Sequence, residues 1–163
     1  MRQAVLLVLL LACQTVACQT ASTMNITSTF TGEIPVRYTC DGADVNPPLT
    51  IRGVPAGTES LALIVDDPDA PLGTWTHWVV WNIPVGDIAE NSVPGEQGTN
   101  SWGKNAWGGP CPPSGTHRYR FTVYALDTKL DLPPATTSDE LKQAMRGHEL
   151  ARGTLTGHYQ RTG

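Results

Sequence analysis

The stretch Leu61-Ala62-Leu63-Ile64-Val65-Asp66-Asp67-Pro68-Asp69-Ala70-Pro71 passes from an unbroken apolar run straight into a turn of acids and prolines. A short continuous apolar run is typical of a β-strand covered on both faces, so residues 61–65 predict a central core strand. Proline fixes φ and removes a backbone donor, so the turn that follows holds its acids in place. The sequence therefore predicts polar side chains, among them Asp67 and Asp69, at the end of a buried strand.

Two further segments predict core strands, because they are rich in Val, Trp, Tyr and Phe. They are residues 77–83, which begin at His77, and residues 118–126. Alternating or short apolar patterns predict further strands at residues 26–30, 36–40, 49–51 and 155–159, with a turn at 32–35.

A second motif, Gly108-Gly109-Pro110-Cys111-Pro112-Pro113-Ser114-Gly115-Thr116-His117-Arg118-Tyr119, leads into the strand at 118–126. Residues 84–116, a stretch that includes the first part of this motif, show no hydrophobic periodicity and are rich in Gly, Pro, Asn and Ser. Long irregular loops in compact domains are usually functional or disordered. Since this loop ends in the motif, we expect it to help build a polar pocket with the Asp67 turn.

One helix is predicted after Thr137, where Thr137-Ser138-Asp139-Glu140 has the pattern of a capping box. Apolar residues then follow helical spacing as far as His148. With many short strands and one clear helix, the chain reads as a single mostly β domain over residues 25–163, built around an antiparallel-rich sheet with one or two peripheral helices.

Composition supports this fold class and excludes others. The 163 residues suit one domain, and 40% hydrophobic with 16% charged residues is typical of a globular protein. Sixteen glycines and 13 prolines favour many short strands over a helical bundle. The net charge of −4 argues against nucleic acid as a partner.

The first 18 residues read as an export signal. A short positive start precedes the apolar stretch Ala4–Ala12, which is too short to span a bilayer but suits a signal-peptide core. Leu10-Leu11-Ala12-Cys13 has the form of a bacterial lipobox, which predicts lipidation of Cys13. Cys18 is the alternative, and an ordinary secretory cleavage near Ala17 or Ala21 is a third. Residues 19–24 then read as a tether, and we expect membrane contact only through the lipid anchor.

Two cysteines remain, Cys40 and Cys111, and both lie beside Gly or Pro in the segments that carry the motifs. If the pocket brings these segments together, export to an oxidising compartment predicts a Cys40–Cys111 disulfide. The alternative is two buried thiols. Neither cysteine has a Cys-x-x-Cys partner, which argues against zinc.

The motifs resemble those of the phosphatidylethanolamine-binding protein family, in particular its bacterial and archaeal branch, often called Raf kinase inhibitor-like. The resemblance covers roughly residues 24–160. It rests on Asp66-Asp67-Pro68-Asp69-Ala70-Pro71, Trp75-Thr76-His77, the second motif, Tyr38-Thr39-Cys40-Asp41-Gly42, Pro47-Pro48-Leu49, Gly103-Lys104 and Gly147-His148-Glu149-Leu150-Ala151. It implies a large β-sheet packed on a smaller one, with peripheral helices.

The resemblance also implies an anion-binding pocket. Carried over by motif, the ligand-binding residues are Asp67, Asp69, His77, Pro112 (or Pro113), His117 and Tyr119. The chain departs from eukaryotic members in having Cys111 between its prolines, and it ends near the last strand, without their C-terminal helix. A small anionic group is therefore a safer expectation than a whole lipid.

The chemistry of these residues suits an anion. Histidine N–H groups and a tyrosine hydroxyl donate to phosphate oxygens, and an acid behind a histidine fixes its tautomer. Trp75 and Trp78 are expected to exclude water from the pocket. Two plainer interpretations stand beside this one: Asp69 as a turn-capping acid and His77 as a core histidine.

Three functions fit this pattern. We rank first an exported binding module for a small anionic or phosphate-bearing ligand. The alternative is an inhibitor, of a protease more readily than a kinase, acting through the pocket rim. The third is a hydrolase, since two Asp and two His suit a divalent metal or acid–base catalysis. The sequence has no nucleophile elbow and no His-Glu-x-x-His spacing, so we expect no enzyme, no metal and no cofactor.

Overall fold

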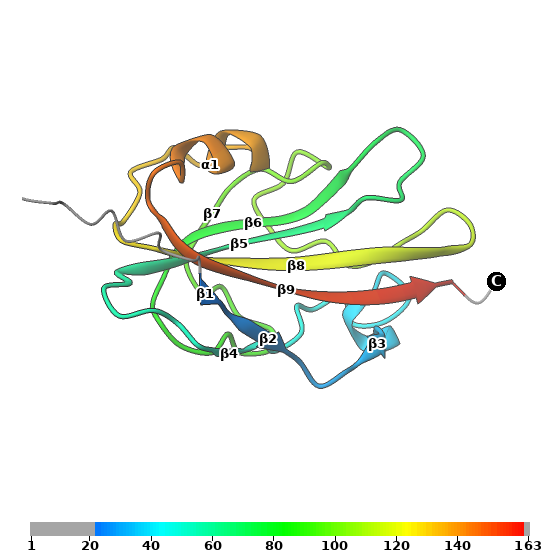
Figure 1. Cartoon of the computed structure of the whole chain (residues 1–163). Helices are drawn as coiled ribbons and strands as arrows, with labels where there is room; N and C mark the ends of the chain where they lie inside the picture. The colour runs from blue at the N-terminus through cyan, green and yellow to red at the C-terminus, as the bar shows by residue number, and fades with distance from the viewer. Residues whose placement is uncertain (1–21, 162–163) are drawn as a thin grey trace, which may run out of the picture.

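The computed structural model describes residues 22–161 and shows two packed β-sheets with an α-helix on the outer side of the larger one (Figure 1). Within these residues the large sheet has seven strands in the order β1-β9-β8-β5-β6-β7, with β3 also paired to β9, and the small sheet joins β2 to β4. The elements are β1 (Ser22–Thr23), β2 (Asn25–Thr27), β3 (Gly32–Glu33), η1 (Val36–Tyr38, a 3-10 turn), β4 (Thr50–Arg52), β5 (Ser60–Asp67), β6 (Trp75–Ile83), β7 (Glu96–Gln97), β8 (Thr116–Leu126), α1 (Ser138–Ala144) and β9 (Glu149–Gln160). The predicted fold class is confirmed.

Strand β5 lies at the centre of the large sheet, and all eight of its residues are buried. Leu61, Leu63 and Val65 belong to the core between the sheets, whereas Ala62 and Ile64 belong to a second core under α1. This double burial confirms the central strand predicted from the unbroken apolar run. The other two strong strand predictions are confirmed as β6 and β8, which pair antiparallel with β5 on either side.

Helix α1 begins with the predicted capping box. The Thr137 hydroxyl accepts from the Glu140 N–H, and the Glu140 carboxylate accepts from the Thr137 N–H. The helix ends at Ala144, short of His148, because the chain turns at Gly147, whose φ is +82°. The helix therefore covers only one end of the outer face of the large sheet (Figure 1).

The predicted strand at residues 36–40 is wrong, because this segment opens with the 3-10 turn η1. The Tyr38 N–H donates to the Pro35 carbonyl at 2.9 Å, so the chain coils there. Gly42 packs directly against the turn: a Cβ at this position would lie 2.2 Å from the Val36 carbonyl oxygen. Of the alternating residues, Tyr38 is buried, whereas Val36 and Cys40 are exposed, so the pattern does not mark a half-buried strand.

The last strand, β9, has 12 residues and extends well beyond the predicted strand at 155–159. Two glycines interrupt its apolar pattern and conceal it from a search for alternation. A Cβ at Gly153 would lie 2.3 Å from the Met24 carbonyl oxygen, and a Cβ at Gly157 would lie 2.5 Å from the Ile34 side chain. Glycine at these positions lets the N-terminal segment pack closely against β9.

The predicted tether, residues 19–24, lies partly outside the described residues, and its last three residues belong to the domain. Strand β1 pairs in parallel with β9, and Met24 is buried. The predicted turn at 32–35 likewise adds β3 to the same strand. The predicted leader, with Cys13 and Cys18, lies outside the described residues. Across residues 22–161 no helix has the length and apolar character needed to cross a bilayer.

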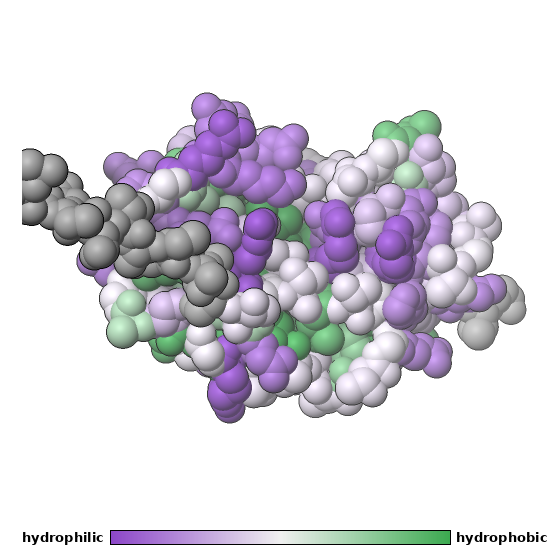
Figure 2. Space-filling model, viewed as in Figure 1, coloured by the Kyte–Doolittle hydropathy of each residue, from purple (hydrophilic) through white to green (hydrophobic). Residues whose placement is uncertain are grey.

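The surface seen in this view is mostly polar (Figure 2). An apolar patch stands out at the tip of the β5–β6 hairpin, at the upper right, where Leu72 is 98% exposed. Gly73 donates to the Ala70 carbonyl at 3.1 Å, so a tight turn holds Leu72 at this tip.

Candidate functional site

A cavity of about 200 Å³ lies at one end of the large sheet, where β5 ends and β6 begins. Antiparallel pairing brings the start of β8 to the same end, so both sequence motifs meet there. The lining residues are Asp67, Ala70, Pro71, Trp75, His77, Trp102, Cys111, Pro113 and Tyr119. The predicted convergence of the two motifs on one pocket is thus present in the structure.

Asp67 and His117 form a buried pair behind this cavity. The Asp67 Oδ2 accepts from His117 Nδ1 at 2.7 Å, and the two side chains are 5% and 9% exposed. The other carboxylate oxygen, Oδ1, accepts from the Asp69 N–H at 2.8 Å. Asp67 therefore orients a histidine and closes its own turn with the same carboxylate.

His77 presents one ring nitrogen to the backbone and leaves the other for a ligand. Its Nδ1 lies 2.6 Å from the Gly108 carbonyl oxygen, and since a carbonyl only accepts, Nδ1 carries the proton. Burial lowers the pKa of His77, with the Gly108 carbonyl and the Asp67 charge opposing the shift. At neutral pH the ring is therefore uncharged, and Nε2 is a hydrogen-bond acceptor.

Tyr119 supplies the complementary group. Its hydroxyl is buried and has no hydrogen-bond partner within residues 22–161. Burial, followed by the charge of Asp67, raises its pKa, so the hydroxyl stays protonated and remains a donor. The backbone of Cys111 acts weakly in the opposite direction, but its contact lacks hydrogen-bond geometry. The ring lies edge-on to His77, with centroids 5.2 Å apart.

Three of the six predicted binding residues, Asp67, His77 and Tyr119, line the cavity, and His117 lies directly behind Asp67. The other two do not line it. Pro112 is buried elsewhere, and its neighbour Pro113 forms the wall.

Asp69 faces away from the cavity, toward Arg118. Its carboxylate accepts from the Arg118 backbone N–H at 2.9 Å and from the guanidinium at 2.6 Å and 2.9 Å. These bonds hold the pKa of Asp69 well below its usual range. The structure thus gives Asp69 the turn-fixing role of the plainer interpretation, and it joins the β5–β6 turn to the start of β8.

Sequence reasoning missed Trp102, which forms a wall of the cavity. Its ring lies edge-on to Trp75 at 5.4 Å and to His77 at 5.0 Å. In the sequence, the only sign that Trp102 could belong to the site is its position next to the Gly103-Lys104 motif. Trp78, predicted as a pocket neighbour, packs instead in the core.

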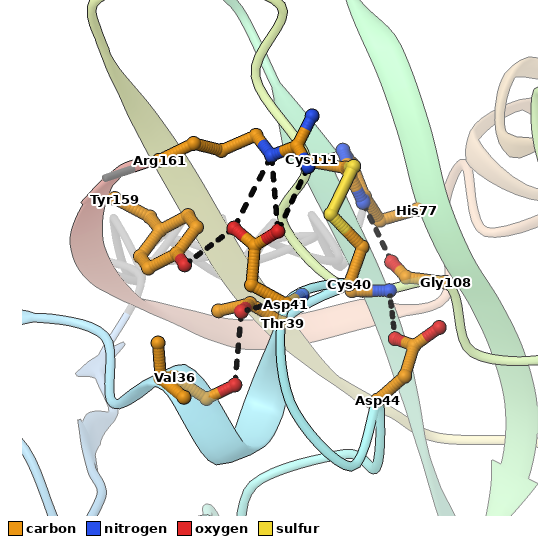
Figure 3. Close-up of a disulfide and its surroundings, with 11 residues drawn as sticks. Val36, Thr39, Cys40, Asp41, Asp44, His77, Gly108, Cys111, Tyr159 and Arg161 are labelled. Carbon is orange, nitrogen blue, oxygen red and sulfur yellow. Dashed lines mark hydrogen bonds and ion pairs between the residues drawn. A yellow bond between two sulfur atoms is a disulfide. The ribbon is translucent and has the colours of Figure 1, made fainter. Parts of the chain in front are cut away.

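The predicted disulfide between Cys40 and Cys111 is present and forms part of the cavity wall (Figure 3). Its Cα atoms are 5.5 Å apart, and the bond closes a loop between residues 71 apart in sequence. The Cys40 N–H donates to the Pro110 carbonyl at 3.2 Å, and the Gly109 N–H donates to Asp44 Oδ1 at 2.7 Å. The 108–113 segment, which carries the wall, is thus fixed by the disulfide, by these two hydrogen bonds and by two more that join Gly108 to His77.

A larger groove of about 550 Å³ lies beside α1 and is lined mainly by Ser and Thr hydroxyls. Its lining holds no histidine, and its charges are paired as Arg120 with Asp66 and Lys142 with Asp139. Throughout residues 22–161 no group of three or more His, Cys, Asp or Glu side chains is placed to hold a metal ion. The cavity at Asp67, His77 and Tyr119 is therefore the candidate site.

The two-sheet fold is that of the phosphatidylethanolamine-binding protein family. The profile of that family matches residues 26–160, and the chain belongs to it.

Its relatives include a UPF0098 protein of Pyrococcus abyssi, 47% identical over 152 residues and covering 85% of each chain. A UPF0098 protein of Methanothermobacter thermautotrophicus is 50% identical over 142 residues, covering 80% of this chain and 92% of the relative.

Two solved structures have the same fold. One is a phosphatidylethanolamine-binding protein homologue from Chlamydia trachomatis, with a TM-score of 0.82 at 38% identity, covering 86% of this chain and 99% of that one. The other is YbcL of E. coli, with a TM-score of 0.79 at 30% identity, covering 86% of this chain and all of that one.

Proposed function

We propose that this protein binds a small phosphate-bearing anion in the cavity beside Asp67, His77 and Tyr119. The observation that carries the proposal is the buried hydroxyl of Tyr119, a residue that lines the cavity, because this hydroxyl has no partner among the described residues. A buried donor without a partner costs about 1–3 kcal/mol. A ligand oxygen placed there removes that cost.

The proton balance of the cavity favours an anion that keeps one proton. Both Asp67 oxygens already accept hydrogen bonds, and the neutral His77 ring offers Nε2 as an acceptor. Hydrogen phosphate, or a phosphomonoester monoanion, accepts from Tyr119 and donates its own proton to His77. A phosphomonoester dianion has no proton to donate and meets stronger repulsion from the Asp67 charge.

The test is calorimetric titration of the folded protein with inorganic phosphate at pH 6, comparing Tyr119→Phe with Tyr124→Phe. Both tyrosines lie on β8 and both are buried, but Tyr124 belongs to the outer core under α1. We expect Tyr119→Phe to lower the affinity at least about tenfold, the range for a hydrogen bond to a charged group, and Tyr124→Phe to leave it unchanged. Equal effects, or no phosphate binding by the wild type, would contradict the proposal and bring the rim-inhibitor alternative to first place.

Export and lipid anchoring are also part of the proposal, with Cys13 as the lipidated residue and Cys18 as the alternative. The Ala4–Ala12 apolar stretch supports export, and the Cys40–Cys111 disulfide is typical of an oxidising compartment. Intact-mass measurement on protein from its native membrane should show a lost leader and added acyl mass. Cytosolic protein that retains Met1 would contradict this part.

A further inference from the structure

The groove of about 550 Å³ beside α1 is separate from the proposed phosphate site, because the two linings have no residue in common. Its volume lies within the range of small-molecule sites, roughly 300–1,000 Å³. Most of the residues that line it carry a hydroxyl group: Thr74, Thr76, Thr99, Ser101, Thr137 and Ser138. The groove therefore offers a surface of donors and acceptors on which the phosphate proposal makes no demand.

The walls of the groove are joined by hydrogen bonds, so the groove keeps its shape without a ligand. Ser101 is bonded twice to the start of β6: its N–H donates to the Thr76 carbonyl at 2.9 Å, and its hydroxyl accepts the Thr76 N–H at 2.8 Å. The Thr99 N–H donates to the Thr136 carbonyl at 2.8 Å, which joins the same loop to the segment before α1. A preformed site loses less entropy on binding than a flexible one.

The charged side chains of the groove are paired with one another. Arg120 donates two hydrogen bonds to Asp66, at 2.7 Å and 3.0 Å, and the Lys142 ammonium lies 3.4 Å from the Asp139 carboxylate. The lining thus holds two positive and two negative groups and no aromatic side chain. An ion would give up its hydration there without gaining an unpaired counter-charge, so the groove favours a neutral polar ligand.

Several hydrogen-bond donors of the groove are not used by the described part of the chain. Arg120 donates to Asp66 through Nε and Nη2, and no hydrogen bond within residues 22–161 involves its Nη1. The Ser101 hydroxyl accepts the Thr76 N–H, but its own proton has no acceptor among these residues. The hydroxyls of Thr76 and Ser138 lie 3.1 Å apart and share one hydrogen bond, so one of their two protons also remains for a ligand.

We propose that this groove binds a neutral saccharide. Sugar hydroxyls both donate and accept, as Ser and Thr hydroxyls do, so the two sets can pair in either direction. The Arg120 guanidinium, held in place by Asp66, adds donors of fixed direction. Threonine also carries a methyl group, which suits the C–H groups of a sugar ring. The inference goes beyond the proposed function and does not depend on it.

NMR titration of the isotope-labelled folded protein tests the proposal with five probes: glucose, galactose and maltose, which are neutral, glucuronate, which is an anion, and glucosamine, which is a cation. We expect at least one neutral probe to shift the backbone amide signals of Thr76, Ser101 and Arg120 and to bind more tightly than both charged probes. The amides of Ala70 and Cys111, which line the phosphate cavity, should not shift. These signals separate binding in the groove from binding in the other cavity.

Arg120→Lys keeps the positive charge beside Asp66 but removes the planar fork, and we expect it to lower the affinity for the neutral sugar about tenfold. Arg118→Lys is the matched control, because Arg118 lies on the same strand, forms the same kind of pair with Asp69 and does not line the groove. It should leave the affinity unchanged. Ser138→Ala, which removes one hydroxyl of the groove, should lower it about threefold.

Absence of shifts with all three neutral sugars overturns the inference. Tighter binding of a charged probe than of every neutral one also overturns it, and so do equal losses in Arg120→Lys and Arg118→Lys. None of these results bears on the proposed function, because no phosphate is present in the experiment.

Discussion

Two His–Asp pairs in this protein have almost the same geometry and very different surroundings. His117 and Asp67 are 2.7 Å apart, and their side chains are 9% and 5% exposed. His148 and Asp127 are 2.8 Å apart, and theirs are 47% and 45% exposed. Because water and salt screen the second pair, similar distances correspond to unequal energies. The comparison teaches that burial, and not contact length, distinguishes the residues of the site.

The two pairs also differ in what they join. The buried pair lies at the cavity end of the sheet, where Asp67 links β5 to β8 and closes the β5–β6 turn. The exposed pair lies at the helix end, where the Asp127 N–H also donates to the His148 carbonyl at 3.0 Å. That backbone bond persists without the side chains, so the exposed pair is the more dispensable of the two.

The largest expected effect is the loss of Asp67. Asp67→Ala removes the acceptor of two hydrogen bonds, from His117 Nδ1 and from the Asp69 N–H, and since a hydrogen bond to a charged group contributes about 1.5–3 kcal/mol, the unfolding free energy should fall by about 3–6 kcal/mol. Asp127→Ala removes the partner of His148, and an exposed pair contributes about 0–1 kcal/mol. Urea unfolding of the two variants measures both values. Similar losses would contradict the comparison.

Reduction of the Cys40–Cys111 disulfide has the next largest expected effect. A loop of this length contributes about 4 kcal/mol in the chain-entropy model, so Cys40→Ser/Cys111→Ser should lower the melting temperature markedly. Histidine NMR signals sharpen the test. The His77 ring, bonded to the 108–113 segment, should shift on reduction, whereas His148 should not. An unchanged His77 signal would show that the disulfide does not hold the cavity wall.

A smaller effect is expected on ligand affinity. His117→Ala removes the donor that Asp67 Oδ2 accepts from, so the bare carboxylate repels the anion more strongly and we expect phosphate affinity to fall by up to about tenfold. His148→Ala should change it less than about twofold, because its pair lies far from the cavity lining. Circular dichroism confirms that both variants are folded. Equal losses in affinity would refute the assignment of His117 to the site.

The smallest expected effect is a pH dependence of stability from His77. Burial lowers its pKa in the folded state, so the unfolded chain takes up the proton first as pH falls below ~6.5. The stabilisation by the neutral ring is complete above that pH and is lost as pH falls toward the folded pKa. Urea unfolding between pH 7.5 and 5 should show this loss in the wild type and not in His77→Asn. Equal pH slopes would mean that His77 is not buried as a neutral ring.

The sequence predicts the parts of the fold whose signals are local. The apolar run of β5 and the capping box at Thr137 depend on neighbouring residues alone, and both are confirmed. The predicted strand at 155–159 is shorter than β9 because Gly153 and Gly157 interrupt the apolar pattern. Glycine is needed at these positions because Met24 and Ile34, which are distant in sequence, pack against them. The 3-10 turn that begins at Val36 likewise depends on the close packing of Gly42, and a search for hydrophobic periodicity does not detect such a contact.

The site shows the same division between local and long-range causes. Its principal side chains, Asp67, His77 and Tyr119, stand in motifs that border core strands, and the structure brings them together. Asp69 was assigned to the ligand because it shares the motif, but its partner Arg118 becomes visible only when β8 is placed beside β5. Trp102 comes from the long loop, whose path no hydrophobic period reveals.

The most direct test of the account is the affinity of the wild-type protein for methyl phosphate, a phosphomonoester, measured by calorimetry from pH 5.5 to pH 8. The cavity offers Tyr119 as a donor and the neutral His77 ring as an acceptor, so the ligand must bring one proton of its own. A phosphomonoester loses its last proton near ~6, and any charge on His77 is lost as pH rises. We predict that the affinity falls steadily across this range. Affinity that stays constant or rises with pH, or no binding at any pH, would contradict the account.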